Sequence, residues 1–242
     1  TTQGTTVVTW TYTDGAGNTS IQTQNVVITD VTPPVPVLAT LANVTAECSV
    51  TSLTPPTATD NCGGIVAVTN NITLPLTNQG TTLVTWTYDD GNGNTTNQSQ
   101  VVIIDDVSGP VPDLATLTNV TAQCTVTSLT APTATDNCGG LVTVSNNASI
   151  PISAQGTTVI TWTYTDLNGN SSTQTQNVII TDVTAPTAVC QNISIFLDGS
   201  GDVTIAATDI DGGSTDNCGA VSLSASTLAF TCADIGTNDV TL

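Results

Sequence analysis

The sequence predicts an all-β chain made of tandem β-sandwich repeats of 76 residues, joined end to end. Trp10, Trp86 and Trp162 follow one another at this constant interval, which identifies a repeat array. Apolar residues alternate with threonine over long stretches, the period expected of strands with one buried face. Each repeat has room for six or seven short strands, with turn signals every 8–12 residues. This spacing is typical of immunoglobulin-like sandwiches.

The best-defined stretch of each repeat is a predicted β-hairpin. Its three copies occupy Gly4–Asp30, Gly80–Asp106 and Gly156–Asp182. In every copy an alternating run is followed by a turn rich in Gly, Asn and Asp and then by a second alternating run. Tryptophan is scarce here and buries about 150–250 Å². We therefore expect it to anchor each core, with an exposed tryptophan for ligand stacking as the alternative.

The array predicts two complete repeats, at 32–107 and 108–183. Each opens with a proline-bearing linker, at Asp30–Pro36 and Asp106–Pro112. Residues 1–31 are expected to be the C-terminal part of a repeat, which alone would leave an apolar face uncovered. Residues 184–242 resemble the N-terminal part of a divergent repeat. Because both outer segments are partial, we interpret the chain as a window within a longer polypeptide.

The composition disfavours several classes of function. The chain has no Lys, Arg or His and carries 19 Asp plus Glu, for a net charge of −19. It therefore lacks the cations that attract nucleic acids and anionic membranes, and no apolar run is long enough to span a bilayer. The usual acid–base residues His and Lys are missing. A glycosidase-type carboxylate pair stays open, but acids repeated in every domain suggest scaffold, so no enzyme is predicted.

The cysteines predict disulfides. Cys48 and Cys62 recur as Cys124 and Cys138, and without histidine a zinc site would lack ligands. Disulfides in turn indicate an extracellular location. We expect short-loop pairs, with Cys218 joined to Cys232 across the same gap and with the partner of Cys190 beyond Leu242. The predicted bonds are Cys48–Cys62, Cys124–Cys138 and Cys218–Cys232.

Recurrent acidic residues are candidates for calcium binding. Asp30, Asp106 and Asp182 end the three hairpins, and Asp60 and Asp136 lie in T-D-N-C loops. Carboxylates, Asn amides and carbonyls suit Ca²⁺, which takes six to eight oxygen ligands. We expect a junction ion held by these residues, with the hairpin-turn acids Asp90 and Asp166 as weaker candidates. Turn formation alone and another metal are the alternatives.

Three motifs carry a family resemblance: the T-P-P opening at 32–34, P-T-A-T-D-N-C-G at 56–63 and T-W-T-Y-x-D-x-x-G-N in the hairpin. Together they resemble HYR (hyalin-type) and related immunoglobulin-like repeats of long secreted surface proteins, notably adhesins of Bacteroidetes. The resemblance covers the whole chain and implies an extended, adhesion-related stalk at the cell surface. The two complete repeats lack the early and terminal cysteines often seen in that family.

The leading functional hypothesis is a non-catalytic stalk or fibre-shaft segment of a large secreted adhesin. Its partners would be neighbouring repeats of the same chain and other copies in a fibre. One alternative is a calcium-dependent glycan-binding module, although most aromatic residues lie in predicted core strands. Another is a pilus-like subunit in which Thr1–Val31 completes a neighbour by strand addition.

Overall fold

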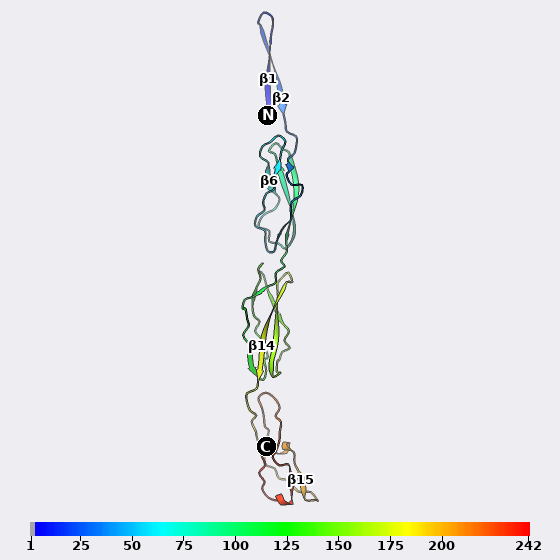
Figure 1. Ribbon diagram of the computed structural model, residues 1–242, viewed down its shortest axis with the longest axis vertical. Coiled ribbons are helices and arrows are strands. Elements are labelled where there is room, and N and C mark those ends of the chain that lie inside the picture. Colours follow the sequence, from blue (N-terminus) through cyan, green and yellow to red (C-terminus); the bar gives the residue numbers. More distant parts are fainter. Residues whose placement is uncertain (1–2) are drawn as a thin grey trace. The chain divides into compact units, whose positions relative to one another are not determined.

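The structure, a computed structural model, describes residues 3–242. It forms two compact units, one ending at Ser108 and the other comprising Gly109–Leu242. Almost all regular structure is β-strand (Figure 1). The predicted fold class, tandem β-sandwich repeats, is confirmed, whereas the four domain boundaries stay a prediction.

The first unit contains three sheets. Strands β1 and β2 pair with each other, β3 pairs with β5, and the four-stranded sheet has the order β4-β8-β7-β6. The strands are β1 (Gly4–Thr13), β2 (Thr19–Ile28), β3 (Val35–Pro36), β4 (Val44–Ala46), β5 (Ala58–Thr59), β6 (Ala67–Asn70), β7 (Gly80–Asp89) and β8 (Thr95–Ile104).

The second unit repeats this plan and adds a smaller part. Its four-stranded sheet has the order β10-β14-β13-β12, and β9 pairs with β11. The elements are β9 (Val111–Pro112), β10 (Val120–Gln123), β11 (Ala134–Thr135), β12 (Thr143–Asn146), β13 (Gly156–Thr165), β14 (Ser171–Thr181), β15 (Asp202–Thr204), η1 (Ala207–Asp209), β16 (Ala229–Thr231) and η2 (Cys232–Asp234). Strands β15 and β16 pair over a small core of Ile205, Ile210 and Phe230. No helix among residues 3–242 is long and apolar enough to cross a membrane.

Each complete repeat consists of two parts that pack against each other. The hairpin half, 80–107 or 156–183, supplies the two long antiparallel strands. The covering half, 32–79 or 110–155, supplies a short strand that pairs in parallel with the second hairpin strand, as Val44 does with Val102. Alternate hairpin residues point into the core, so Val84, Trp86 and Tyr88 are all buried. This is the period-2 pattern of a sheet with one covered face.

Glutamine side chains connect the buried aromatic residues to the covering half. Trp86 Nε1 donates to Gln100 Oε1 at 3.0 Å, and Gln100 Nε2 donates to the carbonyl of Ala42 at 3.0 Å. Each glutamine therefore pairs the polar tip of an aromatic ring with an otherwise unpaired backbone group. The same bridge recurs at Tyr88–Gln98–Leu38, Trp162–Gln176–Thr118 and Tyr164–Gln174–Leu114.

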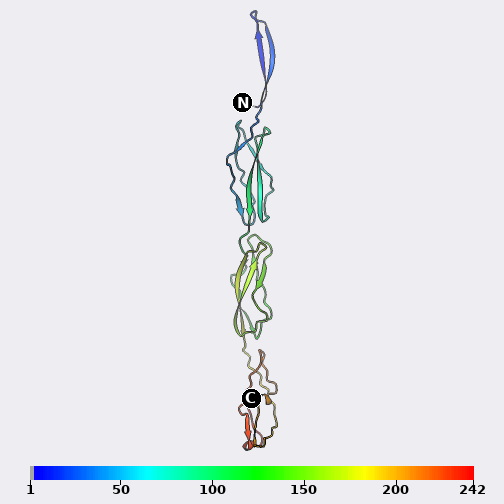
Figure 2. The same ribbon diagram turned by 90° about the vertical axis from the view of Figure 1, so that its right-hand side faces the viewer.

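The hairpin β1–β2 has the same register but no cover. Gly4 pairs with Ile28 and Thr13 with Thr19, and β1–β2 is a two-stranded sheet to which no other described strand of the first unit is added (Figure 1 and Figure 2). Trp10 is consequently 51% exposed, against 1% for Trp86. The apolar face of Gly4–Ile28 is therefore open, which is the exposure expected of a hairpin without a covering half. Tryptophan is a core anchor only where a covering half is present.

The buried and the exposed tryptophan predict different losses of stability when each is replaced by alanine. Trp86→Ala should lower the free energy of unfolding of the first unit by about 3–5 kcal/mol, because it leaves a large cavity in a packed core. Trp10→Ala, a matched change on an exposed hairpin, should cost within about 0.5 kcal/mol. Urea unfolding followed by circular dichroism measures both. Equal losses would contradict the assigned cores.

Candidate functional site at the TDNC loops

The T-D-N-C segments, 59–62, 135–138 and 215–218, are tight loops that fix a cysteine. In the first, the Cys62 backbone N–H donates to Asp60 Oδ2 at 2.8 Å, and in the third, Cys218 N–H donates to Asp216 Oδ1 at 2.8 Å. The aspartate thus closes an Asx turn around the residue two positions later. The recurrent motif is a structural unit that presents the cysteine at a defined position.

The aspartate at each hairpin exit meets such a loop. Within the first unit, Asp30, Asp60 and Cys62 each offer one ligand atom, and these atoms lie within 4.8 Å of one another. Asp182, Asp216 and Cys218 form the equivalent group in the second unit. Asp30 also accepts the backbone N–H of Thr32 at 3.0 Å. The exit aspartate and the loop aspartate therefore share one small acidic site.

The Asp30 group has unsatisfied polar atoms. Asp30 is only 8% exposed, and its Oδ2 atom and Asp60 Oδ1 are buried without a hydrogen-bond partner. Buried carboxylate oxygens are normally paired, because desolvation of an unpaired charge is costly. Desolvation raises the pKa of the Cys62 thiol, and a hydrogen bond to Asp30 and the charges of Asp30, Asp60 and Asp90 raise it further. Chemically, the two carboxylates suit a hard divalent cation, whereas the raised pKa keeps the free thiol mostly protonated.

The structure brings some of the predicted acids together. Asp30 lies with Asp60, and Asp182 lies with Asp216, which is not among the predicted ligands. Asp106 and Asp136 belong to different units, and each repeats the local pattern. Ser108 N–H donates to Asp106 Oδ1 at 3.2 Å and Cys138 N–H to Asp136 Oδ2 at 2.8 Å. Calcium itself stays a prediction.

The hairpin-turn aspartates have a different role. Asp166 accepts the backbone N–H groups of Asn168 and Asn170 at 2.8 Å each, and the Asn170 side chain at 3.0 Å. Asp14 and Asp90 make the corresponding bonds. Their carboxylates are engaged within their own turns. These bonds match the turn-forming alternative, and metal binding by Asp90 and Asp166 stays a prediction.

The predicted disulfide pairs are wrong. Cys124 is bonded to Cys218, 94 residues away, which excludes both Cys124–Cys138 and Cys218–Cys232. Cys62 and Cys232 are free thiols, as is Cys190, so Cys48–Cys62 is excluded too. Cys48 and Cys138 are disulfide-bonded. The suggestion that Cys190 has a partner beyond Leu242 stays a prediction.

The parallel strand explains why cysteines close in sequence do not pair. Cys124 directly follows β10, and its N–H donates to the Thr181 carbonyl at the exit end of the hairpin. The loop after Cys138 instead lies by the hairpin turn, where a Cβ on Gly140 would be 3.4 Å from Leu167 Cδ1. The exit end and the turn end of the hairpin are separated by the length of a ten-residue strand, about 33 Å. A disulfide needs Cα atoms within about 7 Å.

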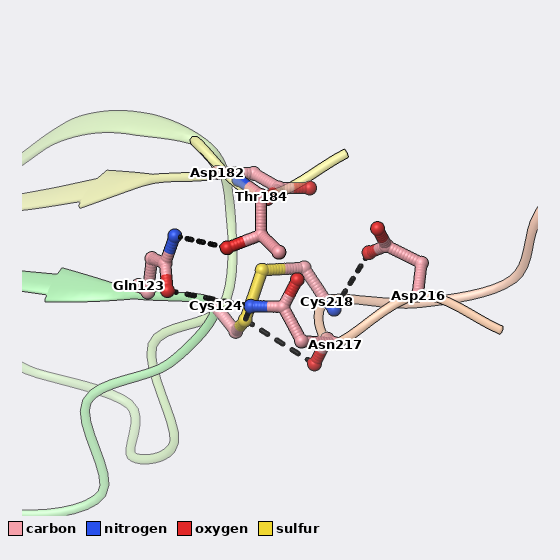
Figure 3. The surroundings of a disulfide bond; sticks show 7 residues. All are labelled: Gln123, Cys124, Asp182, Thr184, Asp216, Asn217 and Cys218. Carbon is pink, nitrogen blue, oxygen red and sulfur yellow. Dashed lines mark hydrogen bonds between the residues drawn. A yellow bond between two sulfur atoms is a disulfide. The ribbon is translucent and has the colours of Figure 1, made fainter. Parts of the chain in front are cut away.

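Residues next to the Cys124–Cys218 disulfide also form hydrogen bonds across the same joint. Gln123 Nε2 donates to Thr184 Oγ1 at 2.8 Å, and Gln123 Oε1 accepts from Asn217 Nδ2 at 3.4 Å (Figure 3). Asn217 Nδ2 also lies 3.2 Å from Cys124 Sγ. The end of β10 is therefore tied both to the linker after Asp182 and to the third TDNC loop.

Sequence reasoning missed the bridging glutamines. They occur as Gln22 and Gln24, Gln98 and Gln100, and Gln174 and Gln176. The signal was available: pairs two residues apart, on one face of a strand, recurring every 76 residues.

Comparison with known proteins identifies the family. Residues 33–104 and 110–193, more than half of the chain, match the family described as "HYR-like domain with 4 cysteines". The chain belongs to this HYR-like family. It is 33% identical over 214 residues to hyalin of Lytechinus variegatus, and 33% identical over 250 residues to hyalin of Strongylocentrotus purpuratus. These alignments cover 78% and 94% of the chain but only 39% and 20% of the two hyalins.

Solved structures give weaker similarities. The extracellular cadherin domains 1–5 of protocadherin gamma B2 align with a TM-score of 0.32 and 14% identity, over 84% of this chain and 51% of theirs. A family 107 endo-fucoidan hydrolase aligns with a TM-score of 0.31 and 14% identity, over 76% of this chain and 34% of the hydrolase. Similarities this low carry no functional argument.

The turn carboxylates predict sensitivity to acid. Desolvation acts to raise the pKa of Asp166, but hydrogen bonds from Asn170, Asn168 and Gly169 outweigh it and hold the pKa below its usual value. A carboxyl with a lowered folded-state pKa contributes stability that is present above its unfolded pKa and is lost as the pH falls through the folded value. Asp166→Ala should therefore melt at a lower temperature than the parent at pH 7. The two curves should begin to approach each other near the usual pKa of 3.8 and converge once the pH is below the lowered folded-state pKa.

Thermal melts from pH 7 to pH 2.5, followed by circular dichroism, test this. Asp239→Ala, a removal of the same charge outside the hairpin turns, serves as the control and should melt like the parent throughout. A deficit in Asp166→Ala that is equally large at both extremes of pH would refute the assignment.

Proposed function

We propose that this chain is a non-catalytic shaft segment of a long secreted surface adhesin. In this role tandem repeats hold a terminal adhesive domain away from the cell, or form the shaft of a fibre. Membership of the HYR-like family and similarity to hyalin support an extracellular structural or adhesive role. The bacterial setting rests on the resemblance of the motifs to repeats of Bacteroidetes adhesins.

The observation that carries the proposal is the Cys124–Cys218 disulfide. It connects the covering half of one repeat to the TDNC loop of the segment that follows Asp182, across the linker. A linker supported by a peptide connection alone can bend freely, whereas a second, covalent connection restricts its motion. Stiff joints between successive segments are a property that a shaft requires and that a soluble enzyme or an isolated lectin does not.

The disulfide also supports a location outside the cytosol. Disulfides form and persist in oxidising compartments and are rare where glutathione and thioredoxin keep thiols reduced. A chain without Lys or Arg has no side-chain cations to hold it to acidic polymers, so its contacts are expected to be with other repeats. Neighbouring repeats and other copies of the fibre are the proposed partners.

An exchange experiment in the producing cell separates a shaft from a binding module. Residues 32–183 of the full protein would be replaced by unrelated immunoglobulin-like repeats of equal length, or deleted. A shaft acts through length, so the exchange should keep adhesion within about twofold and the deletion should reduce it. Adhesion lost equally in both variants, with surface display unchanged, would favour a glycan-binding surface in these repeats.

We further propose that the Asp30 group binds calcium. Asp30 Oδ2 and Asp60 Oδ1 are buried acceptors without donors, and the chain contains no side-chain cation that could neutralise them. Calcium accepts carboxylate oxygens and completes its coordination with carbonyls and water. The Cys62 thiol is a soft ligand that calcium does not favour. Bound calcium would supply positive charge between the hairpin exit and the TDNC loop.

Calcium binding predicts a metal-dependent melting temperature. Because the ion would bind the folded site and not the unfolded chain, millimolar calcium should raise the melting temperature relative to EGTA, by an amount that grows with calcium concentration. Asp30→Asn should reduce the shift to the part that the equivalent Asp182–Asp216 group supplies. Asp105→Asn, with the same loss of charge outside the group, should retain it. Identical melts in calcium and EGTA, or a shift in Asp30→Asn as large as in the parent, would refute the site.

A further inference from the structure

The exposed face of hairpin β1–β2 has the composition of a buried one. Val26 and Ile28 are 41% and 38% exposed, whereas Val178 and Ile180, at the same positions of β14, are 0% and 1% exposed. The difference lies in the cover and not in the residues, because β1–β2 and β13–β14 have the same antiparallel register. The hairpin therefore presents a surface complementary to a covering half.

The glutamines of this hairpin have only half of their usual partners. Trp10 Nε1 donates to Gln24 Oε1 at 3.1 Å and Tyr12 OH to Gln22 Oε1 at 3.2 Å. In both complete repeats the equivalent glutamine Nε2 groups donate to backbone carbonyls of the covering half. Within residues 3–242, no carbonyl accepts from Gln22 or Gln24. Two oriented donors therefore face outward where such a half would lie.

The covered hairpin of the second unit supplies the register of the missing strand. Val120 of β10 pairs in parallel with Val178, and the N–H of Cys124 donates to the carbonyl of Thr181. The corresponding positions of the first hairpin are Val26 and Thr29. A strand added to β2 in the same register would therefore place its terminal cysteine beside Thr29.

That position is next to a free thiol. Thr29, Asp30 and Cys62 line one open cavity of about 320 Å³, and Cys62 is exposed and unbonded. Cys62 also occupies the TDNC position that Cys218 occupies in the bond to Cys124. The added strand would thus bring its cysteine to Cys62, as β10 brings Cys124 to Cys218.

A side-chain contact at this site shows where the strand would insert. Asn61 Nδ2 donates directly to Thr32 Oγ1 at 3.3 Å. At the occupied site Gln123, from the end of β10, lies between the equivalent pair, bonded to both Thr184 and Asn217. The Asn61–Thr32 contact thus occupies the place of a glutamine that precedes the incoming cysteine.

We propose that hairpin β1–β2 and Cys62 form a covalent docking site for another HYR-type covering half. Its strand, of the Val120–Gln123 type, would pair with β2 and present the cysteine that follows it to Cys62. This deepens the proposed shaft function, on which it rests, because it makes the strand-to-loop disulfide a joint that recurs along an array. The thiol chemistry is tested separately from adhesion, so either proposal can fail alone.

The bond forms by thiol–disulfide exchange. The Cys62 thiolate attacks a sulfur of a small disulfide RSSR, forming a mixed disulfide and releasing one thiolate RS⁻. The thiolate of the incoming cysteine then attacks the Cys62 sulfur and releases the second RS⁻. Two protein thiols are oxidised and one disulfide is reduced to two thiols. The oxidant is a low-molecular-weight disulfide, or an oxidoreductase that carries one.

A peptide exchange assay on the full chain tests the docking site. The probe has the sequence of residues 117–128, L-T-N-V-T-A-Q-C-T-V-T-S, with its cysteine as a glutathione mixed disulfide, and a shuffled peptide keeps the same composition. Cys62 should react about tenfold faster with the native-sequence peptide than with the shuffled one. One or two net backbone hydrogen bonds would supply this factor. Cys190 and Cys232 should show no preference. Mass-spectrometric peptide mapping identifies the modified thiol.

Variants on the two faces of β2 separate docking from simple thiol exposure. Val26→Asp, on the face to be covered, should bring the ratio of the Cys62 reaction rates with the two peptides close to one. Ile21→Asp, on the opposite face of the same strand, should retain it. Reaction of Cys62 with a small aromatic disulfide should be equal in both variants, which shows that the thiol and its loop are intact. An equal rate for the native-sequence and shuffled peptides, or a preference that survives Val26→Asp, would overturn the proposal.

Discussion

Each sandwich depends on the burial of the hairpin's aromatic face beneath its covering half. Trp86 and Tyr88 are buried where the cover is present, and Trp10 and Tyr12 are half exposed where it is missing. Ion pairs cannot hold the halves together, because the chain has no side-chain cation. Apolar contact provides the attraction, and glutamine amides provide the directional link between the rings and the facing backbone. The repeat is therefore specified by hydrophobic burial and uncharged hydrogen bonds.

Much of the fold was predictable because its signals are local. Alternation over Gly80–Asp89 and Thr95–Ile104, with a Gly- and Asn-rich turn between them, defines the hairpin from neighbouring residues alone. The parallel pairing of β4 with β8 was not predictable in this way. It joins two strands on opposite sides of β6 and β7 in the sequence, and no short-range pattern encodes which edge the chain returns to.

The same limit explains the mixed outcome at the candidate site. Recurrence every 76 residues points to Asp30 and Asp60, because repeated acids mark equivalent places, and the structure places their carboxylates close together. Pairing the cysteines required their positions in space. Cys48 and Cys62 are close in sequence, but one follows the parallel strand and the other lies in a loop that shares a cavity with the hairpin-turn residue Asp90. The short loop between Cys48 and Cys62 favours their pairing, but the parallel strand places the two cysteines at opposite ends of the sandwich.

The order of the two halves has a consequence for biosynthesis. The covering half leaves the ribosome before the hairpin that it must cover, and Ala42 and Gln100, which bond across the two halves, lie 58 residues apart. At about 5–20 residues per second, the covering half waits roughly 3–12 s for its partner. Until then it has only short strands and no apolar face to pack on.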